Sequence, residues 1–280
     1  DDMPRIGDVS PDIPFSWFSP ISDRLNGDWN KLWNVSTKLI NEETSDNVEN
    51  DGWLSIEKDD WSIIAFSHPD RTQYPAGHGH NDFGSFCLYF SGWAILVDKG
   101  RLNYIPVEQG GSAGMESQEH NALIIDSDDA LFVGTGVESL FSAVSIGRTN
   151  CALGENNNSI IWDIPCHNGA KWLRMLKVDS DSRVTIVDKV ESCKLVQGFL
   201  NLRSSVNPKQ VSARHVEFLV NEYLCEIKQL NTHNLEIGST EFYPQYGEKI
   251  KSKRLYWSAS AEADCVESII QISIKKTGVK

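Results

Sequence analysis

The spacing of apolar residues changes partway along the chain. In the segment 22–43, Leu25, Trp29 and Leu32 recur at helical spacing, which predicts one short amphipathic helix. From Trp53 onward, short apolar or alternating segments are separated by polar turns, and this is typical of β-strands. The candidate strands cover 53–58, 61–67, 85–91, 93–98, 121–126, 171–178, 182–190, 195–203, 223–229, 254–260 and 268–276.

More than ten strand candidates with almost no helix between them indicate antiparallel sheets rather than alternating β-α-β units. We therefore predict an all-β fold, a large antiparallel β-sandwich or super-sandwich, with a short N-terminal helical and irregular lead-in. The expected division is a lead-in over 1–50 and a β-sandwich domain over 51–280. No repeat of fixed period is present, which argues against a propeller.

Composition narrows the class of protein. The 280 residues are 40% hydrophobic and include nine tryptophans, enough for a sizeable core. A formal charge of −13 argues against a nucleic-acid partner, because phosphate binding needs clustered Lys and Arg. No apolar run reaches the ~18 residues of a membrane span. The six cysteines lie far apart without a C-x-x-C pair, and we expect mostly buried thiols rather than disulfides.

Four polar residues near strand boundaries are candidates for a metal site. His78 and His80 stand one residue apart on a glycine-rich segment, so both side chains can point to the same side of an extended backbone. Asp98 ends an apolar strand candidate, and His120 precedes another. Two imidazoles and one carboxylate form a common ligand set for Zn²⁺ that leaves a fourth position open.

Simpler interpretations of the same residues remain open. The H-x-H pair can be an accident of sequence, Asp98 can cap the turn at Lys99-Gly100, and His120 can be a core histidine bonded to backbone. The other histidines have no partner at informative spacing, so we expect solvated or core roles for them; they are His68, His167, His215 and His233.

Three segments together resemble the C-terminal domain of the heparinase II/III-like polysaccharide lyases. They are "GHGHNDFGSF" (77–86), "ILVDKGRLNY" (95–104) and "EHNALIIDSDD" (119–129). That family shows an H-x-H-x-D element, a strand ending in Asp-x-Gly with a tyrosine soon after, and an His-Asn pair opening the next strand. Order, spacing and strand context all agree, and the resemblance is strongest over about 75–130.

The resemblance implies a zinc-containing lyase that cleaves uronic-acid-containing polysaccharide by β-elimination. By the family pattern His80, Asp98 and His120 would hold Zn²⁺, a structural ion beside the active site. His78 would be a catalytic group, and Tyr104 is a second catalytic candidate. The expected partners are an acidic polysaccharide and an upstream α/α toroid domain of the same protein. The 280 residues alone are expected to be inactive. A periplasmic or secreted bacterial setting is also implied.

Two departures from the family pattern bear on the substrate. Lys99 replaces the more usual proline, and 117–119 (Ser-Gln-Glu) stands where an arginine often precedes the His-Asn pair.

Two other functions stay open. A non-catalytic carbohydrate-binding or surface-polysaccharide module would keep the sandwich without turnover. A cupin-like metalloenzyme would also carry H-x-H, but cupins usually supply a glutamate a few residues later, and 83–86 contains none.

Overall fold

The computed structural model describes most of the chain after the lead-in. The described residues are 53–66, 82–100, 102, 116–129, 149–166, 168–231, 233–244 and 248–278. The helix expected within 22–43 and the domain boundary at 50/51 lie outside them. No helix in the described ranges is both long and apolar enough to cross a membrane.

Three antiparallel sheets make up the fold, as the strand spacing predicted. The first has the order β1–β2–β3–β4, with β1 Trp53–Lys58, β2 Trp61–Phe66, β3 Phe86–Phe90 and β4 Trp93–Leu96. The second has the order β12–β13–β14–β17–β10–β9–β8–β7, with β7 Asn150–Leu153, β8 Ser159–Pro165, β9 Lys171–Ser180, β10 Arg183–Glu191, β12 Lys209–Ser212, β13 His215–Val220, β14 Tyr223–Gln229 and β17 Cys265–Lys276. The third has the order β15–β16–β11–β5–β6, with β5 Leu123–Ile125, β6 Asp128–Asp129, β11 Leu195–Asn201, β15 Glu236–Phe242 and β16 Ile250–Ser260.

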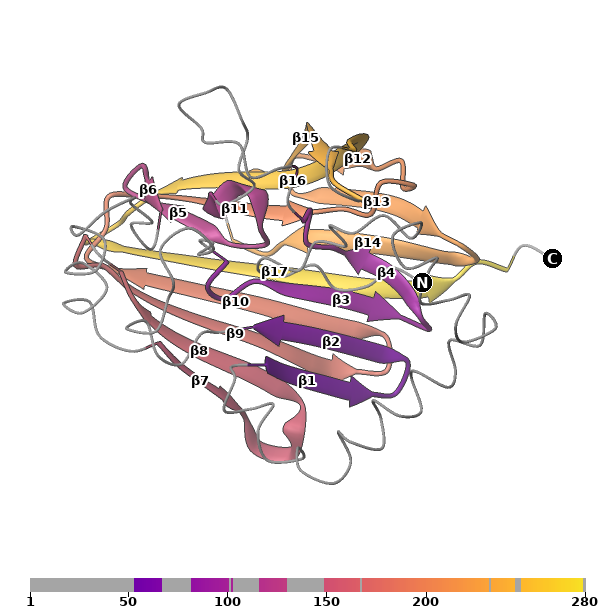
Figure 1. The fold of residues 1–280 in the computed structure, drawn as a ribbon, viewed down its shortest axis with the longest axis horizontal. Coiled ribbons are helices and arrows are strands. Elements are labelled where there is room, and N and C mark those ends of the chain that lie inside the picture. Colours follow the sequence, from indigo (N-terminus) through magenta and orange to yellow (C-terminus); the bar gives the residue numbers. More distant parts are fainter. Residues whose placement is uncertain are drawn as a thin grey trace, which may run out of the picture.

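The two shorter sheets pack against one face of the eight-stranded sheet. In Figure 1 the indigo and purple strands β1 to β3 run across β8, β9 and β10, while β5, β11 and β16 lie beside them. One continuous core joins all three sheets, with Ile63 and Phe86 from the first, Trp162 and Trp172 from the second and Trp257 from the third. The layers therefore form one sandwich with a shared interior.

The alternation of apolar residues explains which face of each strand is buried. In β9, Trp172, Arg174, Leu176 and Val178 are buried, and the residues that alternate with them, Leu173, Met175 and Lys177, are exposed or partly exposed. Because side chains of a strand alternate between faces, one apolar period buries one face of the sheet. All six cysteines are free thiols, four of them buried, as expected for a fold that needs no disulfides.

Candidate metal centre and its supporting network

Two of the three candidate metal ligands meet in the structure. Asp98 follows β4, and His120 follows the 3-10 helix η4 (Ser117–Glu119). The Asp98 Oδ2 and His120 Nδ1 atoms are 2.7 Å apart, although 22 residues separate them along the chain. Both residues are buried, at 1% and 0% exposure. The third expected ligand, His80, and the catalytic candidates His78 and Tyr104 lie outside the described residues.

Hydrogen bonds fix the Asp98 carboxylate in place. The Ser85 hydroxyl donates to Oδ2 at 3.3 Å, and the Gly100 backbone N–H donates to Oδ1 at 3.1 Å. Gly100 has a φ of +73°, a conformation that glycine adopts without strain. Asp98 therefore does cap the turn that follows it, and it also contacts the imidazole. The capping interpretation of this carboxylate is therefore confirmed, and its role as a metal ligand stays a prediction.

The charge of Asp98 shifts the pKa of His120. Burial disfavours the charged imidazole, but the adjacent Asp98 carboxylate outweighs burial and raises the pKa of His120 to about 9. Without a cation the pair is thus an imidazolium–carboxylate ion pair at neutral pH. His120 is therefore buried as a core histidine would be, but its Nδ1 bonds to a carboxylate rather than to the backbone.

The pair fits a zinc ion in donor type. Zinc binds imidazole nitrogen and carboxylate oxygen at about 2.0–2.2 Å, so two donors of a tetrahedral ion lie about 3.3 Å apart. The observed 2.7 Å is a hydrogen-bond distance. An ion would replace the shared proton, and the two atoms would separate by roughly half an ångström.

Asn121, beside His120, connects three strands around this pair. Its amide nitrogen donates to the carbonyls of Phe86 at 2.7 Å and Val97 at 3.1 Å. Its amide oxygen accepts the backbone N–H of Asn201 at 2.6 Å. The side chain is fully buried, and these contacts pair its polar atoms with backbone groups of three segments. Asn121 thereby holds β3, the end of β4 and β11 at fixed positions around the site.

A buried ion pair between β9 and β10 contacts the backbone on both sides of this site, at Gly84 and Asn121. Arg174 of β9 donates to Asp188 of β10 through Nε at 2.7 Å and Nη2 at 3.0 Å. Its Nη1 donates to the carbonyls of Gly84 at 2.8 Å and Asn121 at 2.5 Å. The Trp172 indole also donates to Asp188, at 2.8 Å. Sequence reasoning missed this network, although Arg174 and Asp188 occupy inward-facing positions of alternating strands and that was a usable signal.

The two positions that depart from the family pattern contact each other. The Lys99 ammonium is 3% exposed and forms an ion pair with Glu119. It also donates to the Thr240 hydroxyl of β15 at 2.7 Å. Burial lowers the pKa of Lys99, although Glu119 opposes that shift. This lysine therefore serves the interior of the fold and does not present a free charge to a ligand.

A polar hollow adjoins this pair. It has a volume of about 540 Å³ and lies along β15 and β16, where Thr240 lines it together with Ser239, Lys251 and Lys253. Lys253 donates to Ser239 at 3.1 Å. Glu241 also lines the hollow, so its wall carries charges of both signs.

The described residues thus form a large antiparallel β-sandwich that contains a buried carboxylate–imidazole pair. Residues 42–255 match the family described as Heparinase II/III-like, C-terminal, and the chain belongs to that family. A comparison with curated protein sequences finds no relative.

Solved structures of two lyases share the fold. The heparan sulfate lyase HepC from Pedobacter heparinus superimposes with a TM-score of 0.72 at 12% identity, covering 100% of this chain and 45% of that one. A heparinase III superimposes with a TM-score of 0.67 at 14% identity, covering 98% of this chain and 44% of that one. This chain thus spans less than half the length of either lyase.

Proposed function

We propose that the chain is the C-terminal part of a polysaccharide lyase that cleaves an acidic, uronic-acid-containing polysaccharide by β-elimination. The observation that carries this proposal is the buried contact between Asp98 and His120, at 2.7 Å, in a chain of the heparinase II/III-like family. An upstream helical domain of the same protein would complete the cleft. The lyases that share the fold are more than twice as long, which is consistent with such a domain.

The proposed metal ligands are His80, Asp98 and His120. They would hold Zn²⁺ as a structural ion, and the ion, when bound, would fix the loop that carries His80. His78 is two residues away on that loop. Ordering the loop would thus keep the His78 imidazole at one position in the cleft.

The chemistry required of this chain is proton transfer. In β-elimination the C5 proton of a uronic acid is removed, a double bond forms between C4 and C5, and the bond to the O4 leaving group breaks. An imidazole can exchange a proton near neutral pH, so His78 is the proposed group that takes the C5 proton or neutralises the adjacent carboxylate. Tyr104 is the candidate that returns a proton to the departing oxygen.

The test uses the parent protein together with this 280-residue chain. The parent should release unsaturated uronate, detected by ultraviolet absorbance, from a uronate polymer, and His78→Ala should lower kcat by about 10²- to 10⁴-fold. The 280-residue chain alone should bind zinc and release no product. A parent that binds the polymer without cleaving it would identify a carbohydrate-binding module instead, and iron with oxygen consumption would identify a cupin-like enzyme.

A further inference from the structure

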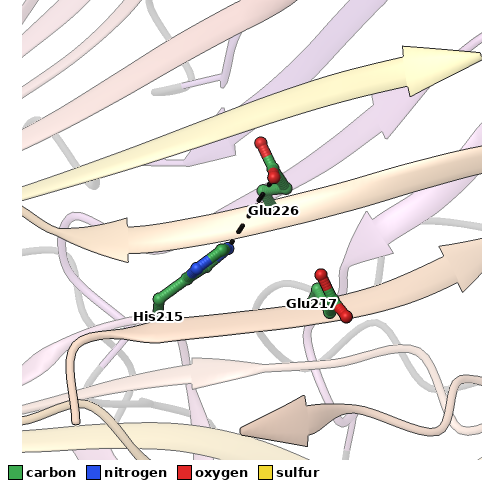
Figure 2. A group of neighbouring side chains, drawn as sticks. All are labelled: His215, Glu217 and Glu226. Atoms are coloured by element: carbon green, nitrogen blue, oxygen red, sulfur yellow. Dashed lines mark ion pairs between the residues drawn. The ribbon is translucent and has the colours of Figure 1, made fainter. Parts of the chain in front are cut away.

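A second group of metal-binding side chains lies on β13 and β14, in the eight-stranded sheet. His215 and Glu217 alternate along β13 with buried Val216 and Phe218, so they project from the face opposite the core. Figure 2 shows the His215 ring directed toward Glu226 of β14, with Glu217 beside it on β13. Sequence spacing offered His215 no partner, and the pairing of the two strands supplies one.

The distances leave room for an ion. His215 Nε2 and Glu226 Oε1 are 3.9 Å apart, which is too long for a hydrogen bond. Two donors that share one ion through bonds of about 2.0–2.2 Å lie roughly 3–4 Å apart. One ligand atom from each of His215, Glu217 and Glu226 falls within 4.8 Å of the others. Among the described residues, His215 Nε2 is buried and makes no hydrogen bond.

The charges around Glu226 divide its two oxygens between different partners. Lys275 and Lys228 contact Oε2, at 2.8 Å and 3.5 Å, and leave Oε1 facing His215. Both ammonium groups are ion-pair partners of the Glu226 carboxylate. The Glu226 side chain is only 11% exposed. The oxygen toward His215 is therefore an anionic donor with little access to bulk water.

The strand register adds a reason for a cation. Glu217 and Glu226 are directly opposite each other across β13 and β14. Like charges at opposed positions destabilise a strand pair, and the two lysines contact only the Glu226 carboxylate in the described part of the chain. A cation between the carboxylates and His215 would reduce this repulsion and would give the His215 Nε2 atom a partner.

We propose that His215, Glu217 and Glu226 bind a second divalent cation of the zinc type. One imidazole and two carboxylates form a mixed nitrogen and oxygen donor set that suits Zn²⁺, whereas Mg²⁺ and Ca²⁺ prefer oxygen ligands alone. The ion joins β13 to β14 near the end of the sheet, where β12 and β13 are the last two strands. This site is separate from Asp98 and His120 and does not depend on the proposed lyase function.

The experiment counts zinc in the chelator-treated 280-residue chain by calorimetric titration with ZnCl₂. Wild type should bind one equivalent more than His215→Gln. Glu217→Gln should weaken that equivalent by about 100-fold or more, because loss of outer-shell partners alone weakens metal sites by about 10- to 100-fold. Glu241→Gln is the matched control, since Glu241 is also a strand glutamate paired with a lysine, Lys249, at 3.0 Å.

Each outcome decides the proposal. A difference of one equivalent between wild type and His215→Gln, with Glu241→Gln equal to wild type, supports it. Equal counts for wild type and His215→Gln overturn it, and so does an equal loss in the control. Zinc bound by Asp98 and His120 adds the same amount to every variant, so a missing ion there changes the total but not the difference. Failure of the proposed lyase centre is thereby distinguished from failure of this site.

Discussion

Replacing Arg174 with methionine should destabilise the fold and weaken metal binding at a position that Arg174 does not touch. The substitution removes both hydrogen bonds to Asp188, at 2.7 Å and 3.0 Å, and leaves that carboxylate buried at 2% exposure with only the Trp172 indole beside it. Breaking a buried ion pair in this way costs about 3–5 kcal/mol. That loss is a large fraction of the about 5–15 kcal/mol that stabilises a typical domain.

Replacing both partners of the pair separates the charge effect from the packing effect. In Arg174→Met/Asp188→Leu no buried charge remains, and only the Trp172 N–H and the carbonyls of Gly84 and Asn121 lose partners. Both variants lose the two carbonyl contacts, so they differ in one buried group: an unpaired Asp188 carboxylate in Arg174→Met and an unpaired Trp172 N–H in the double variant. An unsatisfied neutral group costs about 1–3 kcal/mol, less than an unpaired buried charge. The double variant should therefore be more stable than Arg174→Met, as measured by urea unfolding of the metal-free chain.

Zinc titration then tests whether Arg174 positions the site. Arg174 holds the Asn121 carbonyl at 2.5 Å, next to His120 in the chain, so its loss should weaken zinc binding at Asp98 and His120 by about 10- to 100-fold. Arg183→Met, an exposed change on β10, should alter neither stability nor affinity. A double variant no more stable than Arg174→Met, or unchanged zinc affinity in folded Arg174→Met, would refute this reasoning.

Two further predictions concern the pH dependence and the packing of the sandwich. Asp98 raises the pKa of His120 to about 9 from the ordinary histidine value of about 6.5. The ion pair therefore contributes its full stabilisation of the metal-free chain below a pH of about 6.5, and this stabilisation is lost as the pH rises through 9. Urea unfolding should thus show a fall of up to about 3 kcal/mol over that window, and a flat profile would contradict it. Gly198→Ala would place a Cβ within 2.3 Å of the Trp257 ring and should lower stability by about 1–3 kcal/mol. The control Gly278→Ala meets no atom within 4 Å and should be neutral in the same assay.

Strand spacing predicted the fold well because one side of each strand is buried. The candidate strand 182–190 corresponds to β10 at Arg183–Glu191, where each second residue is core. The pattern did not single out β7, β8, β12, β13 or β15, although β8 and β13 each bury alternate apolar residues. In β15, "EIGSTEF" is only partly buried along most of its length, so the alternation that marks a half-buried strand is weak.

The sequence marked Asp98 and His120 as unusual, and the structure brings them into contact, while their role as metal ligands stays a prediction. Each is a polar residue next to an apolar strand, and such a residue needs a partner when it is buried. The supporting contacts could not be derived in the same way. Arg174 reaches Gly84 across 90 residues, and His215 meets Glu226 only because β13 and β14 pair in one register. Such long-range proximity is a property of the folded chain.

Lys99 and Glu119 form a largely buried ion pair, so a substitution at either position leaves the other residue without its partner in this pair. An arginine introduced at position 119 alone would lie beside the buried Lys99 cation, near Arg254, which already disfavours the charge of Lys99. Such a variant would therefore also need a change at position 99. Natural relatives that carry the arginine should accordingly lack the lysine.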